Sequence, residues 1–279
     1  MSACLIALTD LLTPMRASGE DAATLLNNLL SNDLRQVRDE AGQWSSLNNP
    51  KGRMLANFPL WRQGEGFVLA PSADLADALL KKLCLYKLRS KVQFAVADDL
   101  ALFAACGEEA AISAALRAAA LPPLPDAPVG CARDAGGRVC VRLAASLALL
   151  CLPARDAGAC EAALHAAGLR QGTENDWQLA LIDARLPLIC AATQEAFVPQ
   201  MLGFETIGVS FTKGCYPGQE VIARAQHLGK VKRQLVSRTL DAPAAIGSTL
   251  PDGAQLVAIA AAPTGGFAAL AVSAPDAAQ

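Results

Sequence analysis

Residues 37–98 constrain the fold more than any other part of the chain. Short apolar runs alternate there with turn sequences, Asn48-Asn49-Pro50-Lys51-Gly52 and Gln63-Gly64-Glu65-Gly66, as they do between neighbouring strands. A stretch with apolar residues at helical spacing follows and leads into one more strand-like run. The expected elements of this compact α+β module are strands at 44–47, 53–61, 66–70 and 91–97 and a helix at 72–85.

The regions on either side of this module also mix helices and strands, so the whole chain reads as α+β. The run Trp177–Ala184 is mostly apolar, and its pattern fits a helix or a strand. Turn sequences separate three strands after residue 233, which predicts a small C-terminal β domain in the form of an incomplete barrel. The other expected elements are helices at 22–30, 108–119 and 156–167 and strands at 100–105, 129–133, 138–143, 147–152, 234–240, 256–260 and 267–272.

Composition and charge exclude several classes of protein. The formal net charge is -2 over 279 residues, so we expect no direct nucleic-acid binding. The longest apolar run, 143–152, is far shorter than the ~20 residues of a membrane helix, and the start M-S-A-C-L-I-A-L-T-D lacks the basic region of a signal peptide. Nine scattered cysteines without C-x(2–4)-C spacing suit a reducing compartment and predict no preformed metal site. We therefore expect a soluble cytoplasmic protein without a membrane partner.

The stretch from Val209 to Arg233 contains the strongest candidate for chemistry, Cys215 in the sequence F-T-K-G-C-Y-P-G-Q-E. A thiol reacts or binds metal as the thiolate, which a nearby cation or a helix N-terminus favours. Lys213 offers the cation, and Pro217 suits the first turn of a helix whose amides would point toward the thiol. The alternative is a tight turn around a buried, unreactive cysteine, and the spacing alone leaves both interpretations open.

Three further features carry weaker signals. The turn Asn49-Pro50-Lys51-Gly52-Arg53 holds two cations, which could meet an anionic ligand or simply lie in solvent. Trp177 could stack on a planar heterocycle or fill the core. A basic cluster after the cysteine could meet phosphates, polyglutamate or an acidic partner, or be solvated, and His227 within it is a weak metal candidate. The cluster consists of Arg224, Lys230, Lys232 and Arg233.

The segment Phe211–Arg224 resembles the K-G-C-Y-x-G-Q-E signature of the YgfZ family. The members of this family are folate-binding proteins related to the T-protein (aminomethyltransferase) of the glycine cleavage system. Four other segments resemble family motifs in the same order, and the resemblance extends to about residue 240. They are N-P-K-G-R at 49–53, L-R-S-K-V at 88–92, F-V-P-Q at 197–200 and K-R at 232–233.

The resemblance implies an aminomethyltransferase-like α+β fold with three domains around a central cavity. Residues 1–36 and 99–228 would form a discontinuous folate-cradle domain that carries the cysteine motif. Residues 37–98 would form an inserted, ferredoxin-like α+β module, and residues 229–279 a small C-terminal β-barrel.

The resemblance also implies binding of tetrahydrofolate or a one-carbon derivative. The implied function is an accessory role, rather than catalysis, in assembly or repair of iron–sulfur enzymes, including radical enzymes that thiolate tRNA. Iron–sulfur assembly proteins and those enzymes would be its partners. Cys215 would be the functional thiol, with Lys213 and Tyr216 in its motif. It would hold an iron–sulfur cluster as a transient ligand, receive one, or react with a one-carbon unit on folate, and the sequence leaves these roles open. The implied folate-binding residues are Trp177, Lys51, Arg53, Gln219, Glu220 and Arg224.

The sequence departs from the family pattern at three places. Leu12 stands where some members have a second folate-contacting tryptophan. Ala56-Asn57 stands where the T-protein has an acidic pair that handles the folate amine, and His227-Leu228-Gly229 replaces an aromatic-Arg-Gly sequence. Because the acidic pair is missing, a folate-dependent one-carbon (aminomethyl-type) transferase is the alternative hypothesis rather than the leading one.

Overall fold

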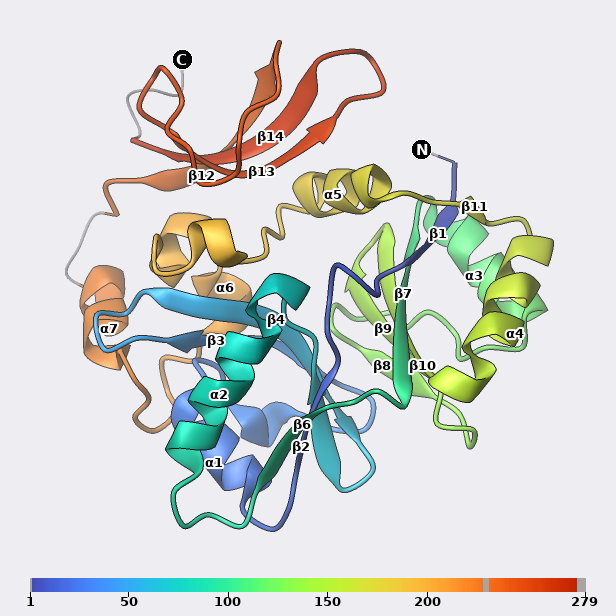
Figure 1. Ribbon diagram of the computed structural model, residues 1–279, viewed down its shortest axis with the longest axis horizontal. Helices are drawn as coiled ribbons and strands as arrows, with labels where there is room; N and C mark the ends of the chain where they lie inside the picture. The colour runs from blue at the N-terminus through green and yellow to red at the C-terminus, as the bar shows by residue number, and fades with distance from the viewer. Residues whose placement is uncertain (1, 228–230, 275–279) are drawn as a thin grey trace.

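Three β-sheets organise the chain, which a computed structural model describes over residues 2–227 and 231–274 (Figure 1). The sheets have six, five and three strands, and helices lie between and outside them. One large cluster of buried hydrophobic side chains includes residues of all three sheets, and a smaller cluster lies on one face of the largest sheet. The chain therefore has the mixed α+β content expected from its sequence.

The six-stranded sheet has the order β11-β1-β7-β10-β9-β8, and its neighbours are antiparallel except for the parallel pair β1–β11. Alternate side chains of its central strands enter different cores: Phe103 and Leu150 enter the smaller cluster, whereas Ala104 and Leu149 enter the larger one. Apolar residues on both faces explain why these strands read as continuous apolar runs. The strands are β1 (Cys4–Ala7), β7 (Leu100–Cys106), β8 (Cys131–Arg133), β9 (Val139–Ala144), β10 (Leu147–Pro153) and β11 (Arg170–Gln171).

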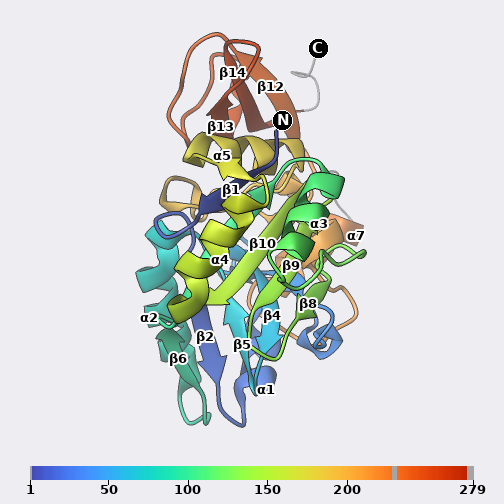
Figure 2. The ribbon, with the colours of Figure 1, turned by 90° about the vertical axis from the view of Figure 1, so that its right-hand side faces the viewer.

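Helices cover both faces of this sheet. The helices α3 (Glu109–Ala118) and α4 (Ala154–Ala166) pack side by side on the face of the smaller cluster, as Figure 2 shows. On the other side, α5 (Glu174–Asp183) lies between this sheet and the C-terminal sheet and contacts β1, β7, β13 and β14. Contacts on both sides explain why the sequence of α5 lacks a clear polar face.

The five-stranded sheet has the order β3-β4-β5-β2-β6 and is antiparallel throughout. Four of its strands come from the module expected at 37–98, and the fifth, β2, comes from the segment before it. The domain boundaries expected from the resemblance stay predictions. The strands are β2 (Met15–Ser18), β3 (Gln43–Asn48), β4 (Met54–Gln63), β5 (Gly66–Leu69) and β6 (Gln93–Val96).

Short helices surround the five-stranded sheet. The helix α2 (Ala76–Lys87) lies on its outside and buries Ala76, Leu79 and Leu83, in agreement with the amphipathic pattern at 72–85. The remaining α-helices are α1 (Ala22–Leu29), α6 (Glu205–Gly208) and α7 (Gln219–His227), and 3-10 turns occur at Leu34–Gln36, Ala73–Leu75, Ala191–Thr193 and Pro199–Leu202.

The C-terminal strands β12 (Gln234–Leu240), β13 (Gln255–Ala261) and β14 (Phe267–Ser273) form an open sheet with the order β12-β14-β13. Within residues 231–274 no closed barrel is found, so the expected C-terminal β-barrel is not confirmed. A sheet of three strands cannot close on itself, and α5 packs on this one instead. Of the departure His227-Leu228-Gly229, only His227 lies within the described residues. The basic residue Lys230 lies outside them.

The helix and strand positions expected from the sequence agree closely with the structure. The ambiguous run at 177–184 is helical, because it forms most of α5. Among the residues that the structure describes, no helix combines the length and the apolar composition that a bilayer span requires.

Candidate functional site

The K-G-C-Y turn directs its side chains in two directions. Lys213 and Tyr216 are buried, with 5% and 6% of their surface exposed, whereas Gly214 and Cys215 between them are exposed. A Cβ atom placed on Gly214 would meet nothing within 4 Å, so the outer side of the turn is open. The interpretation of Cys215 as a buried core cysteine is therefore wrong, because its thiol lies at the surface.

Lys213 anchors the turn to the C-terminal end of α1. Its ammonium group donates to the backbone carbonyls of Leu30 at 2.5 Å, Asn32 at 3.3 Å and Asn27. The ammonium group has three N–H donors, and one bonds each of these carbonyls. The last carbonyls of a helix have no intrahelical partner, so Lys213 supplies one. The cation also lies 5.0 Å from the ring centroid of Tyr216. Burial lowers the pKa of Lys213 to about 8, and the Asp33 carboxylate opposes that shift.

The contacts of Lys213 bear on its predicted chemical role. The sequence predicts a free cation beside the thiol at this position, whereas in the structure the ammonium group of Lys213 donates to carbonyls at the end of α1. An anchoring role was missed because spacing along the chain does not show which way a side chain points. The activation of Cys215 by Lys213 stays a prediction.

The turn that carries Lys51 packs directly on the start of α7. Gly218 has a φ of +81°, and a Cβ atom there would lie 2.5 Å from the carbonyl oxygen of Asn49 and 2.7 Å from Cα of Gly52. Only glycine accommodates both that conformation and that contact. Two motifs that lie far apart in the sequence, N-P-K-G-R and K-G-C-Y-P-G-Q-E, are thus brought together.

The two cations of this turn have different environments. Lys51 is exposed, and its backbone N–H donates to Oδ1 of Asn49 at 2.9 Å. Arg53 is half-buried, and its guanidinium group donates to the backbone carbonyls of Glu195, at 3.4 Å, and Ala196. Arg53 therefore ties the turn to the segment before the F-V-P-Q motif, and Lys51 is the cation of the turn that faces solvent.

The helix α7 begins at Gln219, directly after Pro217-Gly218. The backbone N–H of Gln219 donates to the carbonyl of Tyr216 at 3.2 Å, which closes the turn onto the helix. Glu220 and Arg224 are exposed on this helix, and the ring of His227 packs edge-on against Phe211 with centroids 6.0 Å apart. The Cys215 thiol, Lys51 and these polar residues belong to one exposed surface, which we call the cysteine surface.

Trp177 lies elsewhere, in the wall of a pocket of about 460 Å³ where segments from all parts of the chain meet. Only 2% of its surface is exposed, so its indole forms part of the wall rather than an open platform. A capping box between Thr173 and Asp176 fixes the first turn of α5, and Arg170 binds Asp176 and lowers the pKa of that carboxyl to about 2. The position of Trp177 in that turn is therefore rigidly set.

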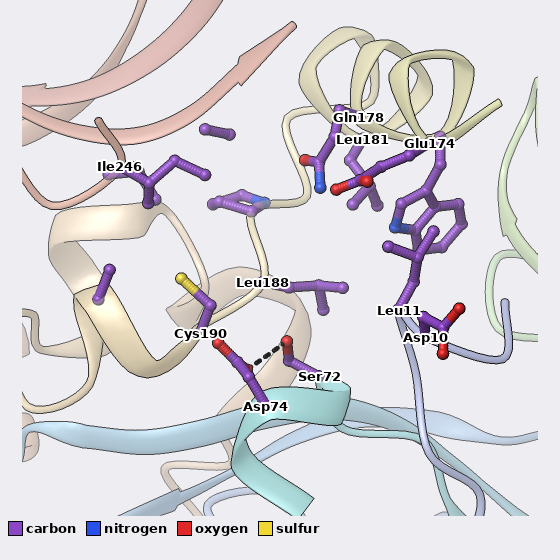
Figure 3. A pocket seen from close by; sticks show the side chains of 15 residues that line it. Asp10, Leu11, Ser72, Asp74, Glu174, Gln178, Leu181, Leu188, Cys190 and Ile246 are labelled. Carbon is purple, nitrogen blue, oxygen red and sulfur yellow. Dashed lines mark hydrogen bonds between the residues drawn. The ribbon is translucent and has the colours of Figure 1, made fainter. Parts of the chain in front are cut away.

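The pocket has an apolar wall and several polar groups (Figure 3). Glu174 and Gln178 line it from α5, Asp10 from the segment after β1, and Asp74 from the 3-10 turn Ala73–Leu75 before α2. Asp74 also accepts hydrogen bonds from Ser72 and from the backbone N–H at position 191, both at 2.8 Å. Apolar side chains complete the wall: Leu11, Leu181, Pro187, Leu188, Ile246 and Val257.

The predicted site residues thus fall into two groups. Trp177 alone lines the pocket, and none of the pocket residues belongs to the cysteine surface. The pocket carboxylates Asp10, Asp74 and Glu174 were missed, because they lie far apart in the sequence and share no motif. A thiol does line the pocket, and it is Cys190 rather than Cys215.

Two of the three departures from the family pattern, at Leu12 and at Ala56-Asn57, occupy buried positions. Leu12 is 1% exposed and forms an isolated antiparallel β-bridge with the pocket residue Ser72. Asn57, also 1% exposed, donates to the carbonyl of Pro187 at 3.0 Å and accepts from the backbone N–H of Ile189 at 2.7 Å. Asn57 therefore holds the segment that forms one wall of the pocket.

Metal ligands do not gather anywhere in residues 2–227 or 231–274: no group of three or more His, Cys, Asp and Glu side chains has the geometry to hold an ion. A cluster bound at Cys215 would need further ligands from another molecule.

Comparison with known proteins agrees with the sequence motifs. No protein-family model matches the chain. It is 31% identical over 220 residues to the tRNA-modifying protein YgfZ of Pectobacterium carotovorum subsp. carotovorum, and 31% identical over 219 residues to the protein of the same name from Klebsiella pneumoniae. Each match covers 78% of this chain but only 65% and 66% of the relatives, so the chain spans slightly less than two thirds of their length.

The fold resembles that of a solved structure. The aminomethyltransferase T of the glycine cleavage system from Bartonella henselae superimposes with a TM-score of 0.77 at 18% sequence identity, over 98% of this chain and 78% of that one. The chain therefore has an aminomethyltransferase-like fold with open sheets. In sequence it is similar, over 78% of its own length, to proteins named tRNA-modifying protein YgfZ.

Proposed function

We propose that this chain binds tetrahydrofolate or a one-carbon derivative in the Trp177 pocket and presents Cys215 to partner proteins. In this proposal it is an accessory protein for the assembly or repair of iron–sulfur enzymes, including those that thiolate tRNA. The observation that carries the proposal is the separation of the two sites. In this proposal the Trp177 pocket holds the folate, and the exposed thiol of Cys215 meets the partner protein.

The pocket fits a reduced folate in size and in chemistry. A volume of about 460 Å³ lies within the range of small-molecule sites, roughly 300–1,000 Å³. A pterin ring is planar and carries several N–H donors, and carboxylates such as Asp10 and Glu174 are acceptors only. The apolar side chains of Leu181 and Leu188 suit the faces of the ring. Trp177 would contact the ring through the small part of its surface that reaches the pocket.

The glutamate end of a folate would lie outside this pocket. Its carboxylates need cations, and no Lys or Arg side chain is among the described residues that line the pocket. When bound, the folate would supply a carrier for one-carbon units. The residues of this chain would orient it, exclude water from the pterin and hold the amine nitrogens near carboxylates.

In this proposal Cys215 serves a macromolecular partner. Lys213 and Tyr216 hold the turn from the inside, so the thiol keeps a fixed position while remaining exposed. A single thiol cannot complete the ligand set of an iron–sulfur cluster. In this proposal the partner, an iron–sulfur assembly protein or a radical tRNA-thiolating enzyme, provides the other ligands.

One observation favours the transferase as a second candidate. Although Ala56-Asn57 supplies no carboxylate, Asp10 and Glu174 bring carboxylates into the pocket from other elements. Such groups could accept a proton from a folate amine. Turnover of methylene-tetrahydrofolate with an amine donor, lost in the Glu174→Gln variant, would support this candidate, and absence of turnover in the purified wild-type protein would dismiss it.

The accessory function is tested by separating the two sites genetically. A bacterial strain without its own copy is complemented with the wild-type chain, with Cys215→Ser and with the matched surface variant Cys84→Ser, which removes the other exposed thiol. We expect Cys215→Ser to lose growth rescue and tRNA thiolation, measured by mass spectrometry of tRNA nucleosides, and Cys84→Ser to retain both. Full rescue by Cys215→Ser would remove the thiol from the proposal.

A further inference from the structure

The end of α2 presents an unusual surface that neither the pocket nor the cysteine surface includes. Leu85 and Leu88 have 72% and 88% of their surface exposed, more than any other large hydrophobic side chain among the described residues. Leu85 is in the last turn of the helix and Leu88 is its C-cap residue, so both lie at the same end of α2. Single exposed leucines are ordinary, but two strongly exposed leucines at one helix end indicate an interaction site.

The backbone holds Leu88 in this position. Its φ is +44° and its ψ is −109°, at the C-cap of α2. A non-glycine residue with positive φ is uncommon and costs conformational free energy. Glycine is the usual residue at such a position after a helix. A leucine there gains nothing from burial, so folding alone does not account for it.

The surroundings of the two leucines are strongly basic. Residues 81–91, K-K-L-C-L-Y-K-L-R-S-K, contain five Lys and Arg residues and no Asp or Glu, in a chain whose net charge is -2. Among the described residues only Lys91 of these five has an ion-pair partner, Glu20 at 2.8 Å. The other four, Lys81, Lys82, Lys87 and Arg89, have no acidic partner among these residues. These four cations together with Leu85 and Leu88 form a surface that we call the α2 patch.

A concave site adjoins the α2 patch. A pocket of about 730 Å³ lies between α1 and the turn after α2, with Leu25 and Leu88 among its apolar lining. Its remaining lining is polar: Asp21, Thr24, Asn28, Arg89 and Ser90. Figure 1 shows α2 on the outside of the five-stranded sheet, where another molecule can reach it.

From these features we propose that the α2 patch is a docking site for a protein segment that is acidic and carries bulky apolar side chains. Charge complementarity selects an acidic partner, because four cations within residues 81–89 have no acidic partner in the part of the chain that the structure describes. The adjoining pocket selects a protein over a lipid bilayer, since a single side chain can insert into a cavity. Two exposed aliphatic side chains at the centre select a protein over RNA, which is bound by aromatic stacking and phosphate contacts. This proposal does not rest on folate binding or on Cys215.

A fluorescein-labelled helical peptide tests the proposal. Its sequence has Leu at i, i+3 and i+7 and Glu at the remaining positions, and a control peptide has Ser in place of each Leu. Fluorescence anisotropy at low salt measures the affinity of the full chain for both. We expect the Leu peptide to bind at least about tenfold more tightly than the Ser peptide, because burial of one leucine side chain raises the affinity by about that factor.

Variants of the patch locate the binding. The double variant Leu85→Ser/Leu88→Ser should bind the Leu peptide about tenfold more weakly, and Lys82→Glu/Lys87→Glu should abolish binding. Ile207→Ser, which removes another exposed hydrophobic side chain, and Arg155→Glu, which reverses an exposed charge, should bind like wild type. Lys87 is half-buried and the other substituted positions are exposed, so circular-dichroism melts should show unchanged folding.

Three outcomes overturn the proposal. The first is equal binding of the Leu peptide to wild type and to the Leu85→Ser/Leu88→Ser variant. The second is no peptide binding together with patch-dependent binding of phosphatidylserine vesicles, which would make the α2 patch a membrane contact. The third is patch-dependent binding of bulk tRNA without peptide binding.

Discussion

Replacing Lys213 by methionine is expected to lower the free energy of unfolding by about 3 kcal/mol at pH 7. Three carbonyls at the end of α1, one in a buried contact and two in partly buried ones, lose their partner. An unsatisfied buried acceptor costs about 1–3 kcal/mol, so about 2 kcal/mol for each carbonyl gives an upper value of about 6 kcal/mol in total. Methionine carries no charge, so the variant avoids the free-energy cost of burying the ammonium group of Lys213. A fall of the Lys213 pKa from 10.5 to about 8 corresponds to about 3 kcal/mol, at about 1.4 kcal/mol per unit.

The pH dependence of the free energy of unfolding separates the effect of the buried charge from that of the lost hydrogen bonds. Because the folded pKa is below the unfolded one, the unfolded chain binds the proton between about pH 8 and pH 10.5, and wild-type stability rises with pH there. Linkage gives a gain of about 2 kcal/mol for wild type over the variant between pH 7.5 and pH 9.5. Urea unfolding at both pH values measures it, with the exposed Lys232→Met as the matched control.

Two results would refute the anchoring role of Lys213. One is a Lys213→Met variant as stable as wild type at pH 7, which would mean that solvent or neighbouring groups satisfy the carbonyls. The other is a difference between wild type and variant that does not change with pH, which would mean that the ammonium group is not buried in the folded chain.

Three further predictions concern Asn57, Gly218 and Tyr216. Asn57→Leu should lose about 2–4 kcal/mol of stability, because both of its hydrogen bonds to residues 187–189 are buried, and should weaken tetrahydrofolate binding in calorimetry. Gly218→Ala should reduce growth rescue and lower the melting temperature, since its Cβ would meet backbone at 2.5 Å, whereas Gly214→Ala should behave like wild type. Burial raises the pKa of Tyr216 to about 12, so the folded chain retains this proton and wild-type stability should fall from about pH 10 to pH 12, a loss absent in Tyr216→Phe.

Local patterns in the sequence predict most of the secondary structure. The turn sequences around residue 50 and residue 64 separate β3, β4 and β5 as expected, and the leucine spacing of α2 gives its buried face. The run at 177–184 stayed ambiguous because α5 packs between two sheets and shows no polar face. The closure of the C-terminal strands into a barrel was expected by resemblance, and the described strands form an open sheet.

The site was predictable only in part. The motif around Cys215 is contiguous, so its importance is visible in the sequence. The inward direction of Lys213 is not, because it depends on where the end of α1 lies. The pocket carboxylates Asp10 and Glu174 come from segments more than a hundred residues apart and converge only in the fold.

The most direct test of the two-site account is an anaerobic calorimetric titration of tetrahydrofolate into three proteins. They are wild type, Cys215→Ser and Gln178→Trp, which fills the pocket from α5. If folate binds in the Trp177 pocket, Cys215→Ser binds like wild type and Gln178→Trp binds at least about tenfold more weakly, a loss of about 1.4 kcal/mol or more. Wild-type affinity in Gln178→Trp together with lost binding in Cys215→Ser would contradict the two-site account and place the folate at the cysteine surface.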